Sequence, residues 1–91
     1  MNNKTRKKVM GIATQVCTYR ESIEDLKSDV ENIRDDEEEK YENLPEGLQE
    51  SEMGEKLMEV YEKLDSVVNM LDTIVDELDE ASTELEDIVS L

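Results

Sequence analysis

The chain contains no histidine, tryptophan or phenylalanine, and only one cysteine, one proline and three glycines among its 91 residues. Without histidine it lacks the commonest general base, the Ser-His triads and the Glu-x-x-His metal signature of bundle enzymes. Gly11, Gly47 and Gly54 are isolated, so no glycine-rich loop is present to hold a phosphate group. We therefore expect a protein that is not an enzyme and that carries no cofactor.

Disulfide and membrane signals are equally scarce. The single cysteine, Cys17, cannot form a disulfide within the chain, and we expect it to be a surface or boundary residue. No apolar run approaches the ~20 residues that span a bilayer. The apolar stretch Val9–Ala13 follows a basic start as in a signal peptide, but polar residues interrupt it soon afterwards. We expect a soluble, cytoplasmic protein that makes no contact with a membrane.

Negative charge dominates the composition. The chain has 26 acidic and 10 basic residues, which gives a net charge of −16. Residues 1–20 hold five bases and no acid, so residues 21–91 hold five bases against all 26 acids, a net charge of −21. Such a body repels nucleic acid and anionic lipid and is attracted to basic protein surfaces. We therefore expect the basic N-terminal residues not to bind nucleic acid directly.

Two heptad series organise the apolar residues, with positions labelled a to g. In the C-terminal series an apolar residue follows each leucine after three places. The a row is Leu57, Leu64, Leu71, Leu78 and Leu85, and the d row is Val60, Val67, Ile74, Ala81 and Ile88. An N-terminal series alternates a and d residues in the same way: Val9, Ile12, Val16, Tyr19, Ile23, Leu26, Val30 and Ile33. These series predict one helix from about residue 4 to 42 and a second from about residue 52 to 90.

The segment 43–51 separates the two predicted helices. It contains the only proline, Pro45, which disfavours helical geometry at Leu44. Ser51 is the expected N-cap of the second helix, because its hydroxyl can accept a hydrogen bond from an amide two or three residues later. Two helices of about 40 residues joined by a short corner must run antiparallel. We predict an all-α fold, an antiparallel and coiled-coil-like two-helix hairpin over residues 1–91.

A corner centred near residue 47 predicts the register, because facing residues should then have numbers that sum to 92–94. Val9 would lie near Thr83, and Ile33 near Val60. Ion pairs between Arg34 and Asp65 and between Lys27 and Asp72 would help to select the alignment. The same register brings N-terminal cations beside acids of the second helix. The cations are Lys4, Arg6, Lys7 and Lys8, and the acids are Glu84, Glu86 and Asp87.

The second helix is apolar at a third heptad position, e. Its apolar stripe is therefore wider than a two-stranded seam requires, and a single hairpin would leave part of it in water. We expect these residues to pair two hairpins into a homodimeric four-helix bundle. A monomer, another oligomer and a hetero-complex remain alternatives. The expected interface residues are Tyr61, Val68, Val75 and Val89.

Runs of acid raise two further hypotheses. Asp35–Glu39 supplies five consecutive carboxylates, but it lacks the alternating ligands and central glycine of a calcium-binding loop, so we expect no dedicated metal site. From Asp65 to Leu91 the chain has nine acids and no base. A dimer about 60 Å long with twice the net charge of one chain would have roughly one charge per 1.9 Å, close to the ~1.7 Å of B-DNA. The acidic residues expected to bind a partner are Asp65, Asp72, Asp76, Asp79, Glu80, Glu84 and Asp87, together with Asp35, Asp36, Glu37, Glu38 and Glu39.

The corner also carries a resemblance to a known group of proteins. Its sequence, from Asn43 to Glu55, contains Asn-Leu-Pro-Glu, then Leu-Gln, then Ser-Glu-x-Gly-Glu. It resembles the corner of small acidic helical-hairpin accessory proteins of Gram-positive phages and integrated mobile elements. The resemblance covers about residues 41–91. It implies an accessory protein in the host cytoplasm and favours inhibition of a host defence nuclease.

We therefore predict a non-enzymatic protein that acts by binding another protein. In the more specific hypothesis it is an acidic nucleic-acid mimic, comparable to an anti-CRISPR protein, that occupies the basic channel of a nuclease or another nucleic-acid-binding protein. The alternative is a structural or assembly adaptor that works through helix packing, without mimicry.

Overall fold

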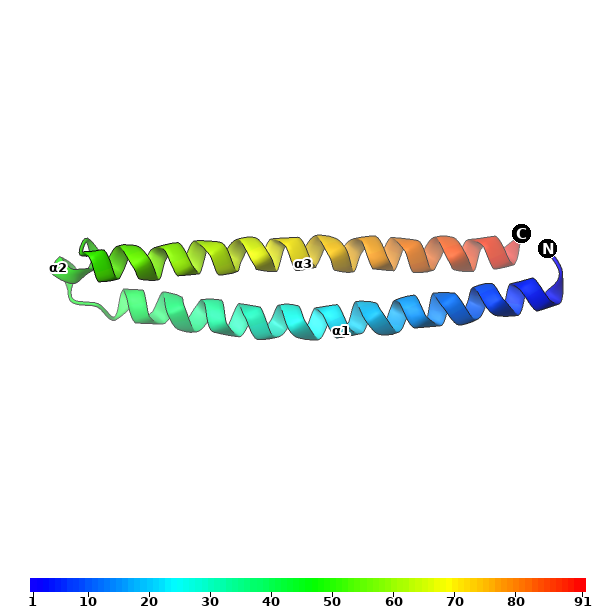
Figure 1. The fold of residues 1–91 in the computed structure, drawn as a ribbon, viewed down its shortest axis with the longest axis horizontal. Helices are drawn as coiled ribbons and strands as arrows, with labels where there is room; N and C mark the ends of the chain where they lie inside the picture. Colours follow the sequence, from blue (N-terminus) through cyan, green and yellow to red (C-terminus); the bar gives the residue numbers. More distant parts are fainter. The chain divides into compact units, whose positions relative to one another are not determined.

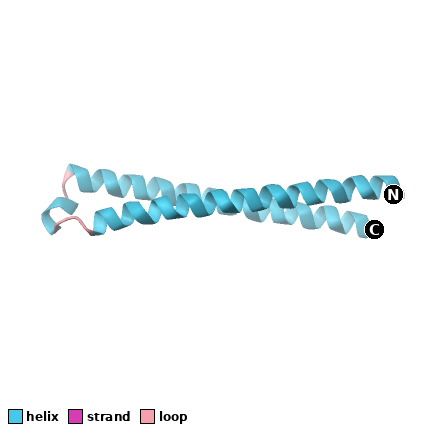
Figure 2. Ribbon diagram, turned by 90° about the horizontal axis from the view of Figure 1, so that it is seen from below, coloured by secondary structure: helices cyan, strands magenta, loops and turns pink.

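The computed structural model describes residues 1–91, and every regular element in it is a helix. Helix α1 spans Asn3–Glu42, the four-residue helix α2 spans Glu46–Gln49, and α3 spans Glu52–Ser90 (Figure 1). Only the short connections around α2 and the chain ends lie outside helices (Figure 2). The prediction of an all-helical protein with two long helices is confirmed. None of the helices is long and apolar enough to cross a bilayer.

The helices divide into two compact units. Unit 1 consists of Met1–Asp25 and Leu71–Leu91, and unit 2 is Leu26–Met70. Each unit contains one segment of α1 and one segment of α3. In unit 1, Cys17 contacts Ser82 and Arg20 contacts Asp79, so the two segments run antiparallel. Unit 2 contains the corner, and its two helical segments form a hairpin.

The register differs from the predicted one. In unit 1 the numbers of the contacting pairs Cys17–Ser82 and Arg20–Asp79 sum to 99, and in unit 2 those of Arg34–Asp65 do so as well. The predicted value of 92–94 is therefore wrong by about one heptad. Val9 is level with Ser90 instead of Thr83, and Ile33 with Ser66 instead of Val60. The cause lies in the corner, where α2 and its flanking turns let α3 begin about five residues beyond the end of α1.

The seam inside each unit uses heptad positions a and e, whereas the sequence predicts a and d. All five buried residues of the chain occupy e positions: Ala13, Gly54, Val68, Val75 and Ser82. The a residues of α3 are half-buried beside them. The large apolar d residues of both helices are between 40% and 63% exposed. Because three e positions hold Ala, Gly or Ser, the helix backbones can approach closely along this side.

Local hydrogen bonds hold the corner of unit 2. Ser51 caps α3, since its hydroxyl oxygen accepts a hydrogen bond from the Gly54 amide at 3.4 Å, as the sequence predicts. The same hydroxyl donates to the carbonyl of Leu48. The side-chain amide of Gln49 donates to the carbonyl of Tyr41 at 3.3 Å, which ties α2 to the end of α1. Helix α1 ends at Glu42, before Leu44, as expected for a residue that precedes proline.

Candidate protein-binding surfaces

Unit 2 has one apolar face. Its d residues are Leu26 and Ile33 on α1 and Met53, Val60 and Val67 on α3, and each is at least 40% exposed. Two antiparallel helices that meet through the same heptad positions are related by a twofold axis, which is perpendicular to the plane containing both helix axes. Corresponding rows therefore lie on the same side of the seam, and the two d rows form a single surface. Exposed apolar patches of this kind are typical of protein-binding sites.

Unit 1 has an apolar face built by the same rule. The d residues Ile12 and Tyr19 of α1 lie on the same side of the seam as Ile74, Ala81 and Ile88 of α3, and all five are exposed. The four large side chains among them keep 40–63% of their surface exposed. Each unit therefore presents an apolar surface on one side and a polar one elsewhere.

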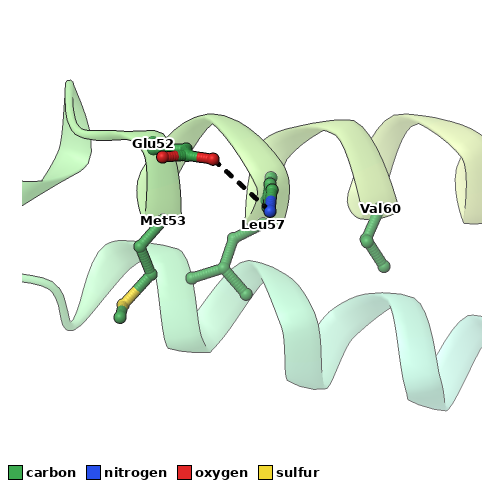
Figure 3. A pocket seen from close by; sticks show the side chains of 5 residues that line it. Glu52, Met53, Leu57 and Val60 are labelled. Atoms are coloured by element: carbon green, nitrogen blue, oxygen red, sulfur yellow. Dashed lines mark ion pairs between the residues drawn. The ribbon is translucent and has the colours of Figure 1, made fainter.

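The apolar face of unit 2 is hollowed at the start of α3. An open groove of about 470 Å³ is lined by Glu52, Met53, Lys56, Leu57 and Val60. Figure 3 shows Met53, Leu57 and Val60 projecting from α3 on the side of α1, with the Glu52–Lys56 ion pair of 3.5 Å at the rim. The lining is mainly apolar, and its two charged residues pair with each other at the rim, so no polar groups converge to orient a small ligand. We interpret the groove as part of the apolar face.

A second groove lies at the end of α1 in unit 2, and charged side chains dominate it. Its lining residues are Ile33, Asp36, Glu37, Glu39, Lys40 and Asn43. Within it, the Lys40 ammonium lies 2.8 Å from the Glu37 carboxylate, and this hydrogen bond raises the pKa of Lys40. No group of three or more acidic or cysteine side chains in the structure is arranged to hold a metal ion.

On the side of the seam away from the apolar face, cations at e positions of α1 meet acids at b positions of α3. In unit 2 the Arg34 guanidinium lies 2.9 Å from Asp65, as predicted, and it also contacts Asp35 at 3.1 Å. These contacts, first the hydrogen bond to Asp35, raise the pKa of Arg34. In unit 1, Arg20 lies 3.3 Å from Asp79. Lys27 and Asp72 belong to different units, so their pairing stays a prediction.

Two further polar contacts cross the seam. In unit 1 the Cys17 thiol and the Ser82 hydroxyl are hydrogen-bonded at 2.9 Å, so Cys17 is partly buried beside a buried polar residue. In unit 2 the Glu38 carboxylate, as an acceptor for the Tyr61 hydroxyl, is the main reason why the pKa of Tyr61 is raised. The Cys17–Ser82 contact satisfies a buried hydroxyl that the close approach of the helices would otherwise leave unpaired.

The acidic residues expected to bind a partner fall into two groups. In unit 1, Asp76, Glu80, Glu84 and Asp87 are exposed and make no ion pair within the chain, whereas Asp79 is paired with Arg20. In unit 2 several of the predicted residues already have partners within the chain. These are Asp35 and Asp65 with Arg34, Glu37 with Lys40, and Glu38 with Tyr61. Asp36 and Glu39 are exposed, as is Asp72 of unit 1.

The basic N-terminal residues are not where the predicted register places them. With numbers summing to 99, Lys8 is level with Leu91, and Lys4 extends past the last residue of α3. Lys4, Arg6, Lys7 and Lys8 consequently form no ion pair with Glu84, Glu86 or Asp87. Arg6 bonds only to its neighbour Asn3, at 3.3 Å, and its Nε atom is buried without a partner.

The residues assigned to a dimer interface also need correction. Val68 and Val75 are each only 7% exposed, and Tyr61 and Val89 are half-buried, so the chain itself already covers the e row of α3. The sequence correctly indicates a stripe too wide for two helices, but the exposed part of it is the d row. The sequence does contain a sign that the e row is the buried one: small residues occupy e positions at Ala13, Gly54 and Ser82. Small side chains suit a closely packed seam better than an outer surface.

No protein-family model, curated protein or solved structure matches the chain. Its function must therefore be argued from these surfaces.

Proposed function

We propose that the protein is a non-enzymatic assembly protein that acts by packing helices of a partner against its apolar d rows. One observation carries the proposal: nine large apolar side chains at d positions are at least 40% exposed in a chain of only 91 residues. A surface rich in exposed apolar groups is costly in water unless a partner covers it. The resemblance of the corner to phage accessory proteins is consistent with such a role in a host cytoplasm.

Substitution on and beside the d row tests this proposal. Val67→Glu and Ile74→Glu place charge on the exposed row, and Ser66→Glu places the same charge on a neighbouring exposed position off that row. We expect both d-row variants to lose protein association, with itself or with other proteins, while Ser66→Glu retains it. Chemical crosslinking of the tagged chain in cells, with unchanged circular dichroism as the folding control, measures the effect. Retention of every crosslink in the d-row variants would contradict the proposal.

A second candidate is mimicry of nucleic acid, supported by the exposed acids of unit 1. Residues 71–91 carry eight acids and no base, and Asp79 is paired with Arg20. In this candidate the partner is a nuclease or another nucleic-acid-binding protein with a basic channel. The unpaired residues Asp76, Glu80, Glu84 and Asp87 would replace phosphates.

Competition distinguishes this candidate from assembly. If the acids replace phosphates, duplex DNA added in excess should release any basic partner that the protein captures. The triple variant Asp76→Asn, Glu80→Gln, Asp87→Asn should bind that partner at least tenfold less tightly, whereas Val67→Glu should bind it normally. Binding that is indifferent both to DNA and to the triple variant would eliminate mimicry and leave assembly.

A further inference from the structure

The apolar face of each unit is bordered on α3 by the g row, whose charge changes sign along the helix. In unit 2 the g residues are Lys56, Lys63 and Met70, and in unit 1 they are Glu77 and Glu84. The two lysines make ion pairs only within α3, with Glu52 and Glu59. Glu77 and Glu84 make none. The α3 edge of the apolar face is thus basic in unit 2 and acidic in unit 1.

Helix α1 has a charge gradient of the same sense. Four cations at residues 4–8 in unit 1 have no ion pair within the chain, and they lie at the start of the helix. At the other end, in unit 2, Asp35–Glu39 supplies five carboxylates, of which Asp36 and Glu39 have no cation hydrogen-bonded to them. A second α1 placed antiparallel to the first would oppose the two charge gradients, which favours the antiparallel direction without pairing particular residues of α1.

We propose that the occupant of the apolar faces is a second copy of this chain, with unit 1 of each copy on unit 2 of the other. Within each contact of unit 1 with unit 2, stacking the faces lays α3 antiparallel to α3 of the second copy, and g rows then meet g rows. Lys56 and Lys63 of one copy lie along Glu77 and Glu84 of the other, twice over by symmetry. The inference rests on the proposed function, since it names the partner of the same d rows.

The exposed area is sufficient for a dimer of moderate affinity. A fully exposed aliphatic side chain offers on the order of 60–120 Å² of apolar surface. About half of this remains on each of the nine large d residues, so one copy offers roughly 250–550 Å². Because homodimer interfaces are about 65% apolar, this apolar area corresponds to a total interface of roughly 400–850 Å² per copy. A standard interface buries about 800 Å² per partner.

Analytical ultracentrifugation of the purified full chain at about 0.15 M NaCl tests the first part of the inference. We expect a reversible dimer at concentrations of about 100 µM, an affinity usual for a small interface. Val67→Glu should remain helical and become monomeric, whereas the neighbouring Ser66→Glu should remain a dimer. A wild-type chain that is monomeric throughout, or a Val67→Glu variant that still dimerises, would overturn the inference.

Charge exchange on the g rows tests the arrangement of the two copies. The variant Lys56→Glu/Lys63→Glu makes both α3 edges acidic, and Glu77→Lys/Glu84→Lys makes both basic. Each variant alone should dimerise roughly 10- to 100-fold more weakly than the wild type, and an equal mixture should form a heterodimer of near wild-type affinity. Net charge provides an internal control. The net charge of the Glu77→Lys/Glu84→Lys variant is smaller in magnitude than that of the wild type. If general repulsion alone controlled dimerisation, this variant would self-associate more strongly, whereas the proposed arrangement predicts weaker self-association.

These outcomes separate the inference from the proposed function. A monomeric wild type whose d-row variants still lose crosslinks to other proteins refutes the second copy and leaves assembly intact. A dimer that survives Val67→Glu refutes the second copy as the occupant of the d rows, and it refutes the proposed function as well if the d-row variants also keep every crosslink to other proteins. A dimer that Val67→Glu abolishes, but whose charge variants do not recover on mixing, refutes the arrangement of unit 1 on unit 2.

Discussion

Gly54 allows the corner of unit 2 to close. A Cβ atom at this position would lie 2.1 Å from the carbonyl oxygen of Gln49 and 2.7 Å from that of Leu48, so any other residue forces the backbone of α2 away from α3. Ser51 meanwhile caps the helix through the Gly54 amide. The absence of a side chain is therefore a packing requirement, although in sequence this position interrupts what would otherwise be a capping box.

Replacement of two glycines by alanine tests this requirement. Gly54→Ala should lower the free energy of unfolding by about 1–3 kcal/mol because of the backbone clash. Gly11→Ala, in a helical position with nothing within 4 Å of its Cβ, should instead raise it by up to about 1 kcal/mol through helix propensity. Urea unfolding followed by circular dichroism measures both values. An equal stabilisation in the two variants would show that the corner leaves room for a side chain at residue 54.

The Tyr61 hydroxyl gives the seam of unit 2 a pH dependence at alkaline pH. Its pKa is raised above the ordinary value of 10.0, first by the hydrogen bond to Glu38. A raised pKa in the folded state means that the contribution to stability is fully present below about pH 10 and is lost as pH rises through the folded pKa. In a Tyr19→Phe/Tyr41→Phe background, absorbance of the phenolate reports Tyr61 alone. Glu38→Gln should lower its pKa, and an unchanged titration curve would exclude the contact.

The helices show how much the sequence determines and where it is insufficient. The spacing of Leu57 to Leu85, the proline at 45 and the cap at Ser51 were sufficient to predict two long helices and the corner between them. The same features could not predict whether the seam uses positions a and d or positions a and e. Val67 and Val68 are equally apolar, and only three-dimensional packing decides which of them is buried. The register failed for a related reason: α2 adds length on one side of the corner, and periodicity alone does not detect that.

Adjacent residues of α3 provide a direct test of the a/e seam. Val68→Ala and Val75→Ala each remove two buried methyl groups and should lower the free energy of unfolding by about 1.5–3 kcal/mol. Val67→Ala and Ile74→Ala remove half-exposed groups and should cost less than about 1 kcal/mol. The comparison requires low micromolar protein, where a dimer would not contribute. A reversed order, with Val67 and Ile74 the costlier pair, would restore the a/d seam.

The acidic residues of the candidate site could be located from the sequence, but not which of them are unpaired. Arg34 and Asp65 were matched correctly because both positions follow the heptad, and Arg20 and Asp79 fit the same rule. The paired residues Glu37 and Glu38 depend on local side-chain geometry, which sequence spacing does not specify. Among the acids predicted to bind a partner, most of those without an ion pair therefore lie in unit 1, whereas the basic N-terminal residues expected to neutralise them lie beyond the end of α3.

The salt dependence of binding distinguishes the two proposed functions, because salt should change the affinity of self-association and the affinity for a basic partner in opposite directions. Two copies with a net charge of −16 each repel one another, and raising NaCl from about 0.01 to 0.15 M shortens the screening length from about 30 to 8 Å. Self-association through the apolar faces should therefore strengthen, with a dimer dissociation constant that falls severalfold, because general repulsion outweighs the few favourable lysine–glutamate pairs. Capture of a basic nucleic-acid-binding protein should weaken over the same range, as attraction between opposite charges is screened. Sedimentation and binding measurements at matched salt concentrations give both slopes, and a dimer that dissociates as salt rises would mean that charge pairs, and not the d rows, hold the two copies together.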